Sequence, residues 1–144
     1  MVAPVAGNHF INMQLTDQED GEKQLGEIID GKNAFVIFRK ENSGYLEDRL
    51  DSLISVYEML KTKDFEIVEV VISSSNNRKP SSVRDMKYPW ISLFDSQGKE
   101  GSIRKYRMGK DEIKTFLVDS TGIIVKVNPS VDEILHYYSR SKKN

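Results

Sequence analysis

Two mainly apolar stretches of strand length, separated by a strongly amphipathic stretch, constrain the fold of this chain more than any other feature. The first, Ala34–Phe38, is a continuous apolar run with the length of a parallel strand covered on both faces of a sheet. The second, Phe65–Ile72, is predicted to be another buried strand from its apolar residues Phe65, Ile67, Val68, Val70, Val71 and Ile72. Between them, from Tyr45 to about Lys63, apolar residues recur at intervals of three and four, which predicts a helix with one buried face. These apolar positions are Leu46, Leu50, Leu53, Ile54, Tyr57 and Leu60. A strand, a helix and a second strand in this order predict a parallel βαβ unit.

The N-terminal part is predicted to add one strand and one helical turn. Phe10–Leu15 is the strand candidate, and the polar stretch after it is predicted to be a break with Gly21 as its turn residue. The helical turn is predicted from the spacing of Leu25, Ile28 and Ile29, and Asp30-Gly31 would end it.

The C-terminal half predicts a hairpin and a last helix. After a loop-like stretch, in which 80–87 is a candidate short helix, Trp90–Phe94 is predicted to be a short strand. Lys114–Asp119 and Ile123–Val127 flank a Ser-Thr-Gly turn, a pattern typical of a β-hairpin. Ser130–Glu133 has the form of a capping box, which predicts the start of a helix. The whole order indicates an α/β fold with a mixed sheet flanked by helices.

Length and composition predict one domain over residues 1–144, with its core between about residues 10 and 140. Hydrophobic residues at 38% and charged residues at 30% are ordinary for a globular protein, and a net charge of -1 gives no reason to expect a nucleic-acid partner. The basic tail from Arg140 to Asn144 is expected to be a solvated helix end. No stretch predicts a membrane span, and the first ten residues do not have the pattern of a signal peptide.

The apolar framework resembles the thioredoxin-like proteins. The segment GKNAFVIF, from Gly31, looks like the strand that precedes the family's redox motif, and residues 51–73 resemble the helix and strand that follow it. Residues 115–135, TFLVDSTGIIVKVNPSVDEIL, look like the family's last hairpin and helix. The resemblance covers about Phe10 to Leu135 and implies a three-layer sandwich with a mixed central sheet. It is strongest to bacterial envelope thiol–disulfide reductases linked to cytochrome maturation, with peroxide-reducing relatives on the same scaffold, and so implies a periplasmic or cell-envelope location.

The residues that would carry the family's chemistry are missing. Counted along this framework, the family's Cys-x-x-Cys motif falls on Ser43, Gly44, Tyr45 and Leu46, and the chain contains no cysteine. A thioredoxin-type reductase attacks a disulfide with a thiolate, and a second cysteine releases the mixed disulfide. The hydroxyl of Ser43 is not ionised near neutral pH, and Leu46 cannot resolve a disulfide. Because peroxide reduction needs the same thiolate, the resemblance implies a redox-inactive domain.

Ser43 is also a weak candidate for an unrelated nucleophile. Such a serine needs a general base within hydrogen-bond distance, and the resemblance brings neither His9 nor His136, the only histidines, to it. Ser43 is instead expected to cap the long helix, whose first turn carries Glu47 and Asp48. These carboxylates favour the helix dipole and would oppose an ionised nucleophile. We therefore assign no catalytic residue.

A second departure from the family concerns Ile113, which occupies the position of its cis-proline. A trans peptide is expected before Ile113, because a cis bond there would cost about 2.5–4 kcal/mol. Trp90 has two interpretations, a buried aromatic residue at a strand start or part of an aromatic rim. With the second, Tyr45, Leu46, Trp90 and Ile113 would line an apolar groove at the former redox site, which is either open for binding or plugged by its own side chains.

Three functions follow from these patterns. The first is a binding or structural module for an extended peptide or protein partner at the former redox site. The second is an oxidoreductase or peroxidase-family protein that uses the thiol of a partner or of glutathione. In the third the groove is filled and the domain serves elsewhere, for instance as a piece of a longer protein. Neither metal-ligand spacing nor a phosphate-binding glycine loop is present, so no metal and no cofactor is predicted.

Overall fold

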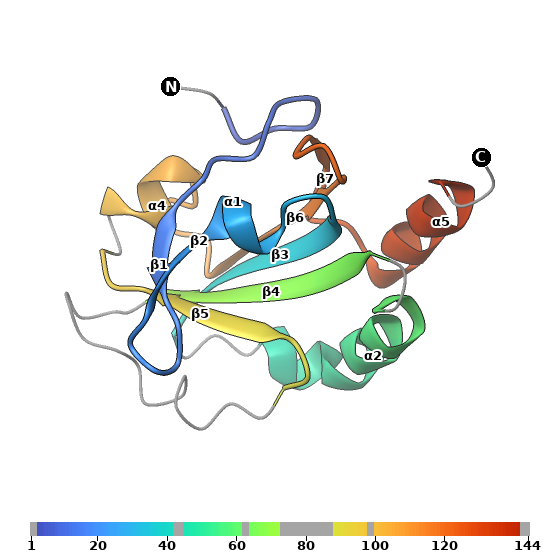
Figure 1. The fold of residues 1–144 in the computed structure, drawn as a ribbon, viewed down its shortest axis with the longest axis horizontal. Coiled ribbons are helices and arrows are strands. Elements are labelled where there is room, and N and C mark those ends of the chain that lie inside the picture. The colour runs from blue at the N-terminus through green and yellow to red at the C-terminus, as the bar shows by residue number, and fades with distance from the viewer. Residues whose placement is uncertain (1–2, 42–44, 62–63, 73–87, 98–99, 142–144) are drawn as a thin grey trace.

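The structure is a computed structural model that describes residues 3–41, 45–61, 64–72, 88–97 and 100–141, without the side chains of residues 45–47 and 139–141. Its strands are β1 (Gln14–Thr16), β2 (Glu22–Gln24), β3 (Asn33–Lys40), β4 (Phe65–Ile72), β5 (Ile91–Asp95), β6 (Ile113–Val118) and β7 (Ile124–Val127). Its helices are α1 (Leu25–Ile28), α2 (Tyr45–Leu60), α4 (Ser102–Lys105) and α5 (Val131–Ser141). The strands form one sheet in the order β2-β1-β5-β4-β3-β6-β7 (Figure 1).

The predicted βαβ unit is confirmed and lies at the centre of the sheet. β3 and β4 pair in parallel over their whole length, and β5 continues the parallel arrangement beside β4. β6 pairs with the other side of β3 in the antiparallel sense, so the sheet is mixed, as predicted. All six residues from Ala34 to Arg39 are buried, which explains the continuous apolar run of this strand.

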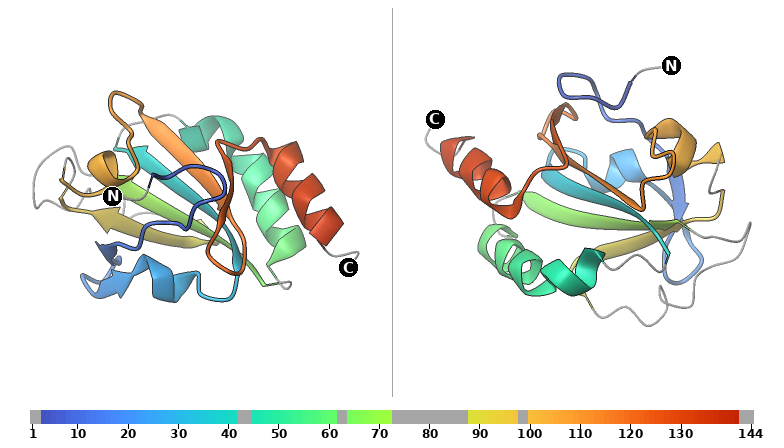
Figure 2. Two further views of the ribbon diagram at one scale, coloured as in Figure 1. Left: turned by 90° about the horizontal axis from the view of Figure 1, so that it is seen from above. Right: turned by 180° about the vertical axis from the view of Figure 1, so that it is seen from behind.

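Helices cover both faces of the sheet, which gives the three layers expected. Figure 2 shows α2 and α5 together against one face, with α1 and α4 on the opposite face. Alternate residues of β3 divide between the two cores: Phe35 and Ile37 pack toward α2 and α5, whereas Val36 and Phe38 pack toward α1 and α4. This alternation follows from the period of two along a strand. The α2 face of the sheet is the face on which the candidate site is built.

The C-terminal hairpin and helix are also confirmed. β6 and β7 pair as predicted, and the turn between them is fixed by Asp119, whose Oδ1 accepts hydrogen bonds from the backbone N–H groups of Thr121 and Ile123. In the capping box, the Ser130 N–H donates to Glu133 Oε1 at 3.0 Å and the Glu133 N–H donates to Ser130 Oγ at 3.1 Å. Both bonds use donors that the first turn of a helix leaves without intrahelical partners.

The N-terminal prediction was wrong in two respects. The expected strand over Phe10–Leu15 is shortened to β1, because the residues before it bond elsewhere: the Phe10 N–H donates to the Gly122 carbonyl. The expected polar break contains β2, which pairs antiparallel with β1. Asp17 Oδ1 accepts hydrogen bonds from the N–H groups of Glu19 and Gly21, and so closes the tight turn between the two strands.

Two further expectations concern the remaining chain. The candidate helix at 80–87 lies outside the described residues. Within the part that the structure describes, no helix is long and apolar enough to cross a membrane.

Candidate functional site

The predicted position of the redox motif, Ser43 to Leu46, follows β3 in the sequence, after its carboxyl end at Lys40. Ile113, the first residue of β6, is paired with Arg39 near the end of β3, and the Lys40 N–H donates to the Glu112 carbonyl at 2.9 Å. α2 begins a few residues later, at Tyr45. Ser43 and Gly44 lie outside the described residues, and Tyr45 and Leu46 are described only as the first backbone turn of α2. The topology therefore brings Ile113 to the strand end from which the chain enters α2.

The loop before Ile113 is fastened by two lysines. Lys40 Nζ donates to the Gly109 carbonyl and Lys114 Nζ to the Tyr106 carbonyl, each at 2.9 Å. Arg107 and Gly109 have positive φ, so the chain turns sharply here. Burial lowers the pKa of Lys114 from its ordinary value, and nearby Asp111 opposes this shift. No peptide bond among the described residues is cis, including the one before Ile113.

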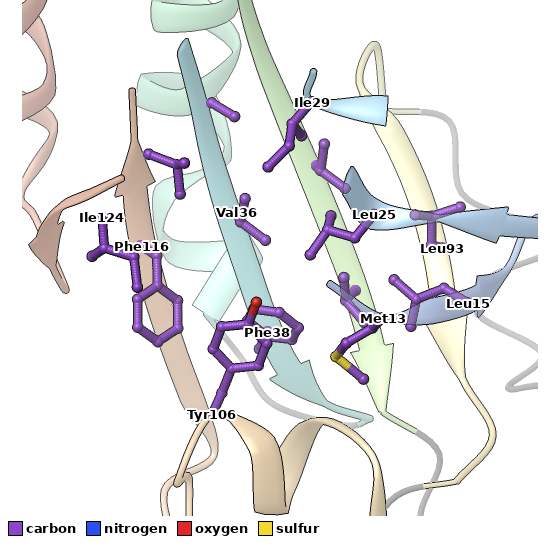
Figure 3. Close-up of a cluster of buried hydrophobic side chains, with 14 of the residues drawn as sticks. Met13, Leu15, Leu25, Ile29, Val36, Phe38, Leu93, Tyr106, Phe116 and Ile124 are labelled. Carbon is purple, nitrogen blue, oxygen red and sulfur yellow. The ribbon is translucent and has the colours of Figure 1, made fainter. Parts of the chain in front are cut away.

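An aromatic cluster supports this loop from the face of the sheet opposite to α2. Tyr106 stacks on Phe38 with ring centroids 4.2 Å apart, and Phe116 completes the cluster (Figure 3). The Tyr106 hydroxyl accepts a hydrogen bond from the Ile11 N–H and donates one to the Ile11 carbonyl. Burial raises the pKa of Tyr106 well above its usual range, so this hydroxyl stays protonated and can act as a donor. The loop therefore rests on a rigid base.

On the α2 face, the same end of the sheet carries a buried ion pair. Arg39 Nε donates to Glu69 Oε2, and the Ser92 hydroxyl donates to Glu69 Oε1 at 3.1 Å. These three side chains come from β3, β4 and β5, and they are 7%, 0% and 6% exposed. A carboxylate buried in this way needs such partners, because desolvation of an unpaired charge is costly.

This ion pair was missed in the sequence, although a signal for it exists. Glu69 interrupts an apolar strand at a position whose neighbours two residues away, Ile67 and Val71, are both buried. A charge at such a position requires a partner on an adjacent strand. Arg39 is the cation that the register of β3 and β4 makes available.

Trp90 does not belong to this site. It is 5% exposed, it stacks on Tyr88 with centroids 5.2 Å apart, and it meets the ring of Tyr57 edge to face at 6.2 Å. Within the described chain, its Nε1 is the one fully buried side-chain nitrogen or oxygen that has no hydrogen-bond partner. The interpretation of Trp90 as a buried aromatic residue at a strand start fits this packing.

The candidate groove of Tyr45, Leu46, Trp90 and Ile113 therefore needs correction at Trp90. Tyr57, its partner on α2, follows Tyr45 by twelve residues, which is about 18 Å along a helix. Trp90 also lies on the opposite side of the central pair of strands from Ile113, since three strand spacings, about 14 Å, separate β5 from β6. Trp90 precedes the start of β5, whereas Ile113 lies at the carboxyl end of β3. The structure does not bring these two residues together.

In the described part of the chain, no contact joins either histidine to Ile113. His9 forms a bridge with Ile123 next to the β6–β7 turn, at the far end of β6 from Ile113, and its Nδ1–H donates to the Phe10 carbonyl at 2.7 Å. His136 is exposed on α5. In the described ranges, no group of three or more metal-ligating side chains is arranged to hold a metal ion.

Comparison with known proteins assigns the chain to a family. The model of the AhpC/TSA family matches residues 6–127, which span most of the chain. The chain belongs to the AhpC/TSA family. None of the curated protein sequences matches it. This AhpC/TSA domain contains no cysteine.

Solved structures agree with the fold of this AhpC/TSA member. The thioredoxin domain of a thiol-disulfide oxidoreductase from Bacteroides vulgatus is 18% identical and has a TM-score of 0.76, with coverage of 97% of this chain and 98% of that chain. A thiol:disulfide interchange protein from Bacteroides sp. is 17% identical, with a TM-score of 0.73 and coverage of 97% and 91%. The exposed lipoprotein thioredoxin of Streptococcus pneumoniae is 16% identical, with a TM-score of 0.67 and coverage of 90% and 99%. At these identities the comparison establishes the thioredoxin-like fold, which confirms the predicted fold class.

Proposed function

We propose that this protein is a redox-inactive thioredoxin-like domain that binds an extended segment of a protein partner beside Ile113. One observation carries this proposal. The AhpC/TSA domain forms its seven-stranded sheet, but it contains no cysteine, the residue that would supply a thiolate. Thiol–disulfide exchange and peroxide reduction both begin with a thiolate, so neither can start from this chain alone.

The geometry around Ile113 supports a binding role. Ile113 is half-buried, so part of its apolar side chain remains available for contact. The loop before it is fixed by Lys40 and Lys114 and rests on the cluster that contains Tyr106. A surface held in one conformation loses little conformational entropy when it binds, which favours affinity.

Selection of peptides tests the binding role. A phage library of random linear peptides is selected on the wild-type protein and counter-selected on Ile113→Lys. Val5→Lys is the matched control, since Val5 is an exposed apolar residue in the N-terminal segment. We expect enriched peptides that bind wild type and Val5→Lys alike and lose binding to Ile113→Lys. If no peptide is enriched, or if Ile113→Lys binds equally, the domain has a structural role and not this binding role.

The second candidate function is an oxidoreductase that borrows a thiol, and the match to the AhpC/TSA family favours it. Insulin reduction and hydrogen peroxide consumption are measured with the protein alone, with glutathione alone and with both. Our proposal expects no rate above the sum of the two single components. A faster combined rate that depends on folded protein would replace the binding proposal with this enzymatic one.

We also propose a location in the bacterial cell envelope. The similarity in fold to the exposed lipoprotein thioredoxin of Streptococcus pneumoniae supports this location. Fractionation of the native host with an antibody against the chain tests it, and recovery in the cytoplasmic fraction would contradict it.

A further inference from the structure

The guanidinium of Arg39 has donors that the described fold does not use. Arginine carries five N–H groups, and within the described residues only Nε of Arg39 is engaged, with Glu69. Glu69 also accepts the hydroxyl of Ser92, so its two oxygens each have a donor. The terminal nitrogens Nη1 and Nη2 are left with four N–H donors that no described residue accepts.

These donors are largely buried but remain partly accessible to solvent. The side chain of Arg39 is 8% exposed, and neither Nη atom is among the fully buried, partnerless atoms of the described chain, where only Trp90 Nε1 is found. The small remaining exposure therefore includes the terminal nitrogens. Charged donors with so little contact with water gain more from an acceptor than fully solvated donors do.

The position of Arg39 links these donors to the proposed binding site. Arg39 and Ile113 are directly paired in the antiparallel ladder between β3 and β6, so their side chains leave the sheet on the same face. Ile37, two residues before Arg39, packs in the core on the α2 side, which identifies that face. A segment in contact with Ile113 would thus lie close to the guanidinium.

We propose that the terminal nitrogens of Arg39 recognise a carboxylate of the segment that binds beside Ile113. This inference rests on the proposed binding function and names the chemistry of its partner. A guanidinium presents Nη1 and Nη2 as a planar fork that matches the two oxygens of a carboxylate, whereas lysine offers a single point charge. The ion pair with Glu69 holds the side chain in position from the Nε side and neutralises part of its charge.

NMR titration of the ¹⁵N-labelled full chain with small probes tests this recognition. The carboxylate probes are N-acetylglutamate N-methylamide, which carries a side-chain carboxylate, and N-acetylalanine, which carries a terminal one. The neutral probes are N-acetylglutamine N-methylamide and N-acetylalaninamide. We expect both carboxylates to shift the Arg39 Nε–H and Ile113 amide signals in a saturable way, with affinities about tenfold above those of the neutral probes. The probe that binds more tightly shows whether the partner supplies a side-chain carboxylate or a terminal one.

Two variants sharpen the test. Arg39→Lys keeps the charge but removes the fork, and it should weaken carboxylate binding, followed at the Ile113 amide, by about tenfold. Arg104→Lys is the same change at the exposed Arg104 of α4, and it should leave carboxylate binding unchanged. Equal shifts with neutral probes, no saturable shift, or full binding to a folded Arg39→Lys would overturn the inference. Should Arg39→Lys not fold, the comparison of charged and neutral probes on the wild type decides alone.

The two proposals fail in different ways. Selected peptides that bind at Ile113 but tolerate Arg39→Lys and neutral replacement of their carboxylates would leave the binding function intact and refute the role of Arg39. Small carboxylates that bind at Arg39 when no peptide binds at Ile113 would support carboxylate recognition by Arg39 and refute the binding of an extended segment.

Discussion

Tyr106 and Ile11, 95 residues apart in the sequence, are joined by two hydrogen bonds through one hydroxyl group. The Ile11 N–H donates to Tyr106 Oη at 3.0 Å, and the hydroxyl donates to the Ile11 carbonyl. The ring of Tyr106 meanwhile packs against Phe38 in the sheet. One side chain thus attaches the N-terminal segment to the core and supports the loop before the candidate site.

Tyr106→Phe should destabilise the fold by about 1–3 kcal/mol, because it keeps the ring and leaves both backbone groups of Ile11 without this partner. Urea denaturation measures the change in the free energy of unfolding. Tyr57→Phe is the control, since within the described chain no hydrogen bond of its hydroxyl is found, and it should change stability little. Equal effects of the two variants would contradict the role assigned to Tyr106.

The ion pair of Arg39 and Glu69 should show strong coupling. Arg39→Met leaves a buried carboxylate unpaired and should cost about 3–5 kcal/mol, and Glu69→Met should cost a similar amount. The double variant should be more stable than either single variant, since it removes both charges together. Urea denaturation of all four proteins gives the coupling energy. Strictly additive losses would show that the two side chains do not depend on each other.

Gly101→Ala should destabilise the protein by about 1–3 kcal/mol. A Cβ at this position would lie 2.8 Å from Cγ of Asp95, a buried carboxylate that accepts the Ser102 N–H at 2.6 Å. The Ser102 amide signal should therefore move in NMR spectra of the variant. Gly109→Ala, at a positive φ with open space around it, should strain the backbone without moving that signal. An unmoved Ser102 signal in Gly101→Ala would refute the steric explanation.

The turn at Asp119 should lose stability in acid. Partial burial raises the pKa of this carboxyl, but hydrogen bonds from the Thr121 hydroxyl and from the Ile123, Thr121 and Gly122 amides outweigh it, so the net pKa is lower than the ordinary value. A depressed pKa in the folded state means that the stabilisation is present above the unfolded-state pKa of about 3.9 and is lost as the pH falls through the folded-state value.

Wild type and Asp119→Asn should therefore differ most in stability near about pH 6, and the difference should shrink below about pH 4. Thermal melts over this range measure it. Asp132→Asn, the same change at an exposed position of α5, is the matched control. A difference that grows on acidification would have the wrong sign.

Trp90, the only tryptophan, reports on the core beneath α2. Its fluorescence should be poorly quenched by acrylamide, because the side chain is 5% exposed. Tyr57→Ala should increase quenching by removing an edge-to-face neighbour of Trp90. Tyr45→Ala should leave quenching unchanged, because Tyr45 lies about 18 Å along α2 from Tyr57. Increased quenching in Tyr45→Ala alone would restore Trp90 to the candidate groove.

The sequence was sufficient for elements whose signals are local. The apolar run of Ala34–Phe38, the helical spacing in 45–60 and the capping box at Ser130 depend on residues close together in the chain, and all three are confirmed. β2 escaped prediction because its sequence, Glu-Lys-Gln, has no apolar alternation. It is a strand because β1 pairs with it and Asp17 closes the turn.

The candidate site was less predictable because its contacts cross between strands. The pairing of Ile113 with Arg39 depends on the register of β6, which the pattern of one strand does not reveal. The bond between Arg39 and Glu69 likewise joins two strands. The two interpretations of Trp90 are separated by its contact with Tyr57 on α2, which the sequence does not reveal. Residue identities suggested Ile113 and Trp90, but only the order and register of the strands decide which side chains meet.

The N-terminal segment also has a bearing on how the domain behaves at high concentration. β7 is the outermost strand of its side of the sheet, and its residue Ile124 is bonded outward to Gly7 and Asn8. An uncovered strand edge offers free backbone groups to other molecules and promotes aggregation. Proteolytic removal of the residues before His9 would take away both partners of Ile124, so we expect the shortened domain to associate more readily with other copies through this edge.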